Sequence, residues 1–288
     1  MGFEPTVPLR GHLLSREAQS TVLCHLSTEG RIPRGSQSVA SRLWGGSLPS
    51  DKMPVMKKTA TSGEIYAAMR RELVALARGL STAEAALAVP HSPAWSISDV
   101  VAHVVGISLD LIEGNLDGLG SDAWTEAQVS SRADRSLEEV CVEWEQMDDR
   151  IDVFMANDPF FAVRAGADLV THVHDVLGAL GRSDQGLEVS GRDGPGVRMA
   201  LERYGPSFCE RAAAAGLGVV RVDAGEQVWQ SGDGVPVIEL RGSAFELLRA
   251  FSGRRSVAQV RSMDWSGDPT PYVPVVSPYG MPDSDIGG

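Results

Sequence analysis

The sequence predicts an α+β protein, in which an antiparallel four-helix bundle precedes a small α+β domain and a disordered leader precedes both. Three observations predict this order. Apolar residues recur at helical spacing through residues 59–182. Short β-rich runs lie beside helical stretches in 183–275. Residues 1–58 are rich in Ser, Gly, Pro and Arg and show no sustained periodicity, which is typical of a chain that cannot bury enough apolar surface to fold.

The leader also differs from the rest in charge. Residues 1–58 hold eight basic and four acidic residues, a net charge of +4. Because the whole chain has a net charge of −12, residues 59–288 must carry −16. We expect either a disordered leader or a wrongly assigned start, with Met53 or Met56 as the true first residue. A cleaved organelle-targeting peptide is the rival hypothesis, which the acidic residues and the missing amphipathic stripe disfavour.

Composition excludes several classes of function. The apolar content of 43% can build a core, and no run approaches the eighteen or so apolar residues of a membrane-spanning helix. The net charge of −12 argues against nucleic acid and against an anionic membrane surface as partners. Cys24, Cys141 and Cys209 form neither a disulfide framework nor a CxxC motif, so a cytoplasmic protein is expected.

Four helices are predicted in the bundle. The first is "TSGEIYAAMRRELVALARGL", with Ser62 as its N-cap. The second follows "PAW", where Ser96 and Asp99 resemble a capping box. The third spans roughly 136–156 and ends at "NDP". The fourth, "AVRAGADLVTHVHDVLGALG", ends at Gly181. Short to medium connections favour antiparallel packing of these helices.

The second domain mixes both kinds of element. "PGVRMALERYGPSFCERAAAAG" predicts a helix that is broken or kinked near Gly205–Pro206. "GVVRVDA", "EQVWQSG" and "PVIELRG" predict strands, "SAFELLRAFSG" predicts a helix, and "SVAQVRSMDW" a further short one. The tail, 276–288, is rich in Pro, Gly and Ser and is expected to be loose.

Polar residues form one stripe on the fourth predicted helix. Positions four apart stack on one helix face, so Asp168 and His172 are neighbours. Arg164 lies one turn earlier and Asp175 about one turn later on the same side, whereas His174 points elsewhere. An imidazole and a carboxylate at this spacing can give two ligands to a divalent metal such as zinc.

A third ligand must come from another helix, and His103 in "DVVAHVVG" is the candidate. His12 and His25 lie in the leader, and His91 lies in a proline-flanked loop, so they are poorer candidates. The alternative to a metal site is a His–Asp hydrogen bond on the helix surface, together with a packed histidine beside a valine stripe.

Three segments resemble a known family. "WSISDVVAHVVG" and "ADLVTHVHDVLGALG" resemble the second-helix and fourth-helix signatures of DinB-like proteins. The similarity is closest to the actinobacterial branch named for mycothiol-dependent maleylpyruvate isomerase. "IELRGSAFELLRAFSGRRSVAQV" followed by "DWSGDP" resembles the sterol-carrier-like C-terminal domain of that branch. The resemblance covers roughly residues 60–275.

The resemblance implies a divalent metal, usually zinc, held by His103, Asp168 and His172. The family often has Glu where this chain has Asp168, which is one methylene shorter and must reach the metal differently. Asp175 is the candidate to accept a hydrogen bond from a ligating histidine.

The resemblance also implies mycothiol, a low-molecular-weight thiol, as cosubstrate of an isomerase or S-transferase that acts on a small electrophile. Arg164, Arg254 and Arg255 are candidates to bind anionic groups of the substrate or thiol, and no catalytic residue is assigned. One alternative is a DinB-like metalloprotein with hydrolytic or other thiol-transfer activity. Another is a non-catalytic, ligand-binding bundle. The sequence predicts neither the electrophile nor the oligomeric state.

Overall fold

The computed structural model describes residues 60–183 and 185–287. All of these residues belong to the unit Ala60–Gly288. The predictions on the leader, including Met53, Met56 and both leader histidines, lie outside the described residues.

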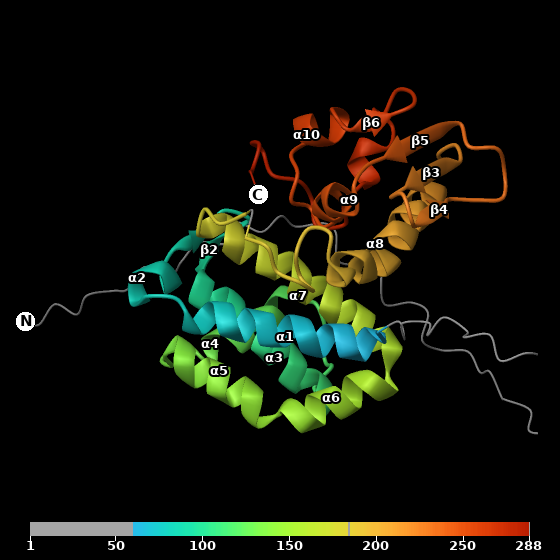
Figure 1. Ribbon diagram of the computed structural model, residues 1–288. Helices are drawn as coiled ribbons and strands as arrows, with labels where there is room; N and C mark the ends of the chain where they lie inside the picture. Colours follow the sequence, from blue (N-terminus) through green and yellow to red (C-terminus); the bar gives the residue numbers. More distant parts are fainter. Residues whose placement is uncertain (1–59, 184, 288) are drawn as a thin grey trace, which may run out of the picture. The chain divides into compact units, whose positions relative to one another are not determined.

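The predicted mixture of helix and sheet is confirmed (Figure 1). α1 packs against α5, α6 and α7, and α3 packs against the same three helices. The bounds of these helices are α1 Ser62–Arg78, α3 Ile97–Glu113, α5 Leu137–Gln146, α6 Asp148–Asn157 and α7 Pro159–Ala179.

Helix caps agree with the sequence at one start and differ at another. Ser96 and Asp99 form the predicted capping box of α3. The predicted N-cap of α1 was wrong by one residue. Thr61 is the cap, because its hydroxyl accepts the backbone N–H of Glu64 while the Glu64 carboxylate accepts the N–H of Thr61.

The single helix predicted over 136–156 is two helices, α5 and α6, that meet at Met147. The predicted apolar stripe is still buried, since Trp144 and Ile151 are both 0% exposed. The second helix starts with two acidic residues, Asp148 and Asp149, which favour a helix N-terminus. Buried Arg70 on α1 forms ion pairs with Asp148 and, on the next turn, Asp152.

Four short elements that precede α5 were not predicted. α4 packs on α3, and β1 and β2 form an antiparallel hairpin before α3. Their bounds are α2 Thr82–Ala85, β1 Ala88–Val89, β2 Ser92–Ser96 and α4 Asp122–Ser130. Both the hairpin and α4 bear on the candidate site.

The C-terminal region combines helices with a four-stranded sheet of order β4-β3-β5-β6. β3 and β5 are parallel, and the other two pairings are antiparallel. α9 packs on α8. The bounds are α8 Pro195–Ala214, β3 Val220–Asp223, β4 Val228–Gln230, β5 Ile238–Arg241, α9 Ala244–Phe251, α10 Val257–Arg261, β6 Asp264–Trp265 and the 3-10 helix η1 Val273–Val275.

The sequence predicts a helix that is broken or kinked near Gly205–Pro206. The break is wrong, because α8 continues through both residues. Proline removes a hydrogen bond to the carbonyl four residues earlier, here that of Glu202, which is exposed and can bind water instead. Gly205 serves packing. A Cβ there would lie 2.5 Å from the Trp229 ring of β4, so only glycine lets the strand approach this closely.

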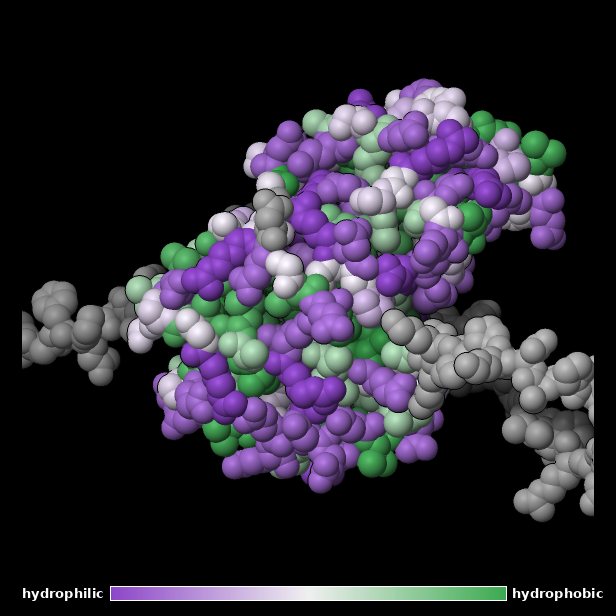
Figure 2. All heavy atoms as spheres, viewed as in Figure 1, coloured by the Kyte–Doolittle hydropathy of each residue, from purple (hydrophilic) through white to green (hydrophobic). Residues whose placement is uncertain are grey.

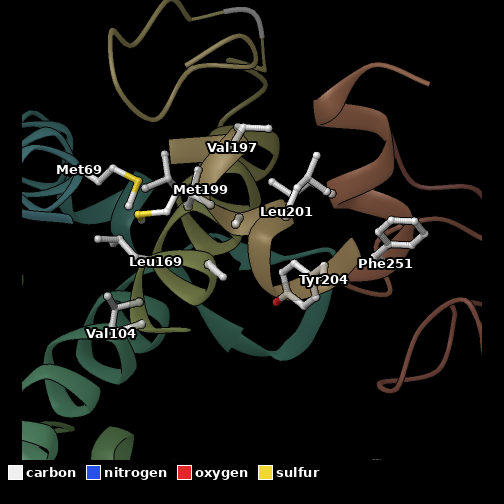
Figure 3. Packing of buried hydrophobic residues seen from close by; sticks show 14 of the residues in the cluster. Met69, Val104, Leu169, Val197, Met199, Leu201, Tyr204 and Phe251 are labelled. Carbon is white, nitrogen blue, oxygen red and sulfur yellow. The ribbon is translucent and has the colours of Figure 1, made fainter. Parts of the chain in front are cut away.

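One apolar core runs through both regions. Figure 3 shows Met69 of α1, Leu169 of α7 and Met199 of α8 packed together, with Tyr204 and Phe251 further along the same cluster. The face in Figure 2 is mostly hydrophilic, with hydrophobic residues in smaller patches. None of the helices in the described residues has the length and apolar character needed to cross a membrane.

The tail after residue 275, which the sequence predicts to be loose, is in part held by contacts with the rest of the protein. Val276 is fully buried, and its carbonyl accepts a hydrogen bond from Arg211 on α8. Further along, the Asp285 carboxylate accepts a hydrogen bond from the Ser256 hydroxyl.

Candidate metal site

Packing of α3 on α7 brings His103, Asp168 and His172 together. His103 Nε2 lies 3.6 Å from Asp168 Oδ2, and His172 Nε2 lies 3.7 Å from Asp168 Oδ1. One potential ligand atom from each residue lies within 4.8 Å of the other two. His103, the side chain expected from another helix, therefore lies beside Asp168 and His172.

The chemistry of these three groups fits a cation. Asp168 Oδ2 is buried and has no hydrogen-bond partner, which is costly for a carboxylate oxygen unless a positive group lies beside it. Two imidazole nitrogens and one carboxylate oxygen are ligands that zinc prefers, and three protein ligands leave a position for a small molecule.

His103 is held by a residue of α4. Its Nδ1 lies 2.8 Å from Gln128 Oε1, and Gln128 Nε2 donates to Asp110 Oδ2 at 2.7 Å. Burial lowers the pKa of His103 to about 4, against the opposing effect of the Asp168 carboxylate. The ring is therefore neutral at pH 7, as a metal ligand must be.

His172 lies beside a carboxylate instead. Its Nδ1 lies 3.1 Å from Oδ2 of Asp175, which is fully buried one turn further along α7. Arg249 and Arg254 each place a guanidinium nitrogen 2.9 Å from the Asp175 carboxylate. Burial alone would raise the pKa of Asp175, but the two guanidinium groups hold it well below its usual range.

These arginines tie the C-terminal region to the candidate site. Arg249 lies on α9 and is fully buried, and its Nη2 lies 2.6 Å from His91 Nε2 in the β1–β2 turn. Burial, and then the charge of Arg249, lower the pKa of His91 to about 3. His91 is thus a neutral acceptor for Arg249.

An aromatic ring lies beside both histidines. The Trp95 ring of β2 is 5.0 Å from the His103 ring and 6.4 Å from the His172 ring, measured between centroids. The two imidazole rings are 5.3 Å apart and nearly perpendicular. Trp95 lies in the second strand of the β1–β2 hairpin, which the sequence did not predict.

The other predicted residues have separate positions. The Arg164 guanidinium lies 4.5 Å above the ring of Phe160. Arg255 pairs with Glu246 at 2.9 Å. His174 points away from the Asp168 stripe, as its helical position predicted, and its Nε2 lies 2.8 Å from the carbonyl of Ser190.

Sequence reasoning missed Gln128, Asp110 and Arg249. Ser121 could have indicated α4, since its side chain caps that helix. Nothing in the sequence places the carboxamide of Gln128 beside His103, because that contact joins two helices.

Comparisons with known proteins add one structural likeness. No family model matches the chain, and no curated protein matches it. A crystal structure of the mycothiol-dependent maleylpyruvate isomerase, solved as a histidine-to-alanine mutant, matches with a TM-score of 0.42 and 14% sequence identity. The match covers 67% of this chain and 88% of that one. A likeness at this level assigns neither a family nor an activity, so the candidate site stands on its own geometry.

Proposed function

We propose that the protein is a metal-dependent enzyme that holds one divalent cation, zinc, through His103, Asp168 and His172. The supporting observation is the convergence of these three groups around a buried carboxylate oxygen that has no hydrogen-bond donor. We further propose that mycothiol is the cosubstrate and that the reaction is isomerisation or thiol transfer on a small electrophile. This finer part rests on the motif resemblance of the sequence.

The proposed cation supplies one kind of chemistry: it acts as a Lewis acid, and a thiol that coordinates it is deprotonated. The two cysteines of the described residues, Cys141 and Cys209, do not provide the thiolate. Burial raises the pKa of both Cys141 and Cys209 to about 11, so both stay protonated at neutral pH. A thiol from outside the chain is consistent with this.

Arginine side chains are the proposed partners for anionic groups of the thiol or substrate. Among the described residues, no carboxylate is paired with Arg164 or with its neighbour Arg203, whose Nη2 donates to the Tyr279 hydroxyl at 2.8 Å. Arg254 is committed to Asp175, and its side chain is 14% exposed. We propose Arg164 and Arg254, from the sequence, and Arg203, from the structure, for this role. Arg255 is the weaker candidate, since it pairs with Glu246.

Cobalt substitution tests the proposal and separates it from its alternatives. Full-length protein is stripped with a chelator, loaded with Co²⁺ and titrated with mycothiol while the visible and near-ultraviolet spectrum is recorded. The proposal predicts tetrahedral cobalt bands and a new sulfur-to-cobalt charge-transfer band. Cobalt bands that do not respond to thiol would favour the hydrolytic metalloprotein. Failure to bind cobalt would favour the non-catalytic bundle.

A further inference from the structure

α4 approaches α3 more closely than any side chain at position 106 would allow. A Cβ on Gly106 would lie 2.5 Å from Cβ of Gln128. The helix is fixed in this place by polar contacts at both ends. Trp124 Nε1 donates to the carbonyl of Asn115 at 3.1 Å, and Arg132 forms two hydrogen bonds, of 2.8 and 3.0 Å, to Glu143 on α5.

The result of this approach is a buried carboxamide between two polar groups. Gln128 is 3% exposed. Its Nε2 faces Asp110 Oδ2 at 2.7 Å, and its Oε1 faces His103 Nδ1 at 2.8 Å. The second oxygen of Asp110 accepts a hydrogen bond from Asn115 Nδ2 at 2.8 Å, so the carboxylate is itself held in place.

The chemistry of the partners fixes which way the carboxamide points. An ionised carboxylate only accepts hydrogen bonds, so the NH₂ group of Gln128 must face Asp110. The carboxamide oxygen then faces His103, and because that oxygen only accepts, His103 Nδ1 must carry the hydrogen. In the neutral ring, Nε2 is left with its lone pair, 3.6 Å from Asp168 Oδ2.

We infer that Asp110 and Gln128 are positioning residues that fix the His103 hydrogen on Nδ1 and turn the Nε2 lone pair toward Asp168. The inference builds on the proposed function, since Nε2 is then the atom offered to the cation. On the other side of the site, Asp175 faces His172 Nδ1 directly. We call Asp110 and Gln128 the relay: they orient His103 through a neutral amide, without placing a second carboxylate against the buried ring.

Three variants test the relay. Gln128→Met keeps the length of the side chain but removes both hydrogen bonds. Asp110→Asn keeps the shape but removes the group that dictates the direction of the carboxamide. The double variant Gln128→Glu with Asp110→Asn exchanges the two functions, so that the new carboxylate accepts from His103 and from the new amide. Matched controls are Gln146→Met and Asp117→Asn, which make the same changes at exposed positions.

The first measurement is the ¹⁵N spectrum of the His103 ring in chelator-treated protein, which reports the tautomer without any metal. We expect the Nδ1–H form in wild type, both controls and the double variant, and a mixture or the Nε2–H form in the two single variants. The second is zinc affinity by competition with a chromophoric chelator. We expect a loss of roughly 10–100-fold in the single variants and substantial recovery in the double variant.

The two measurements test the relay and the proposed function independently. A His103 that stays in the Nδ1–H form in both single variants would overturn the relay, whatever the protein binds. A wild type that takes up no zinc would overturn the proposed function, while the ring spectrum would still decide the relay. Thermal unfolding of each variant shows that the compared proteins are folded.

Discussion

The buried carboxylate of Asp175 allows a prediction about stability. The change Asp175→Asn removes one negative charge from a fully buried position and leaves Arg249 and Arg254 side by side. Each guanidinium nitrogen is 2.9 Å from the carboxylate, which puts the charge centres about 4 Å apart. Each attraction is then about 4 kcal/mol at an effective dielectric constant near 20, before desolvation is counted.

Desolvation of three charged groups offsets much of this attraction, but removal of one partner leaves the others buried without compensation. Such changes cost about 3–5 kcal/mol. In a chain of this size we therefore expect the midpoint of thermal unfolding to fall by roughly 6–20 °C.

Differential scanning calorimetry with chelator present measures this effect apart from any metal. Asp134→Asn is the matched control at an exposed position, for which we expect a change within about 0.5 kcal/mol. A loss below about 1 kcal/mol in Asp175→Asn would refute the reasoning, because it would mean that the two arginines do not depend on this carboxylate.

Three further predictions follow from buried contacts. The pKa of folded His91 is lowered to about 3, so its contribution to stability is present above the unfolded pKa of about 6.5 and is lost as pH falls toward 3. In denaturant unfolding, His91→Gln should therefore lose less free energy of unfolding than wild type over this pH range. Gly106→Ala should cost about 1–3 kcal/mol and weaken zinc binding, since the new methyl group would displace Gln128; unchanged zinc affinity would contradict this. Tyr66→Phe should cost about 1 kcal/mol in urea unfolding, because the Tyr66 hydroxyl lies 2.7 Å from the buried hydroxyl of Ser108.

Local patterns in the sequence predicted local structure well. Helical periodicity placed α1, α3 and α7, and it separated His174 from the stripe of Asp168 and His172, as the structure does. Their role as metal ligands stays a prediction. The contact of His172 with Asp175 follows from the spacing of α-helical positions, and so needed no knowledge of the tertiary fold.

Contacts between elements were not predictable in the same way. The apolar stripe of residues 136–156 resembles one continuous helix because both halves face one core, although α5 ends and α6 begins at Met147. Gly205 resembled a helix breaker, yet its missing side chain makes room for Trp229. Likewise, Gly106 and Gln128 acquire their meaning only when α3 and α4 are seen together.

The arginine pair in "SGRRS" shows the same limit. The sequence offered Arg254 and Arg255 as equal candidates for anion binding. The structure separates them, because Arg254 pairs with Asp175 on α7 whereas Arg255 pairs with Glu246 on α9. Which neighbour a charged side chain meets depends on the packing of distant segments, and spacing along the chain does not encode it.

The most direct test of the central claim is the zinc stoichiometry of purified full-length protein, measured by elemental analysis after dialysis against excess zinc. We predict about one equivalent in wild type and in Asp134→Asn, and its loss in His103→Ala, Asp168→Ala and His172→Ala while all variants remain folded. A wild type without zinc, or three variants that keep it, would contradict the claim that these side chains form a metal site.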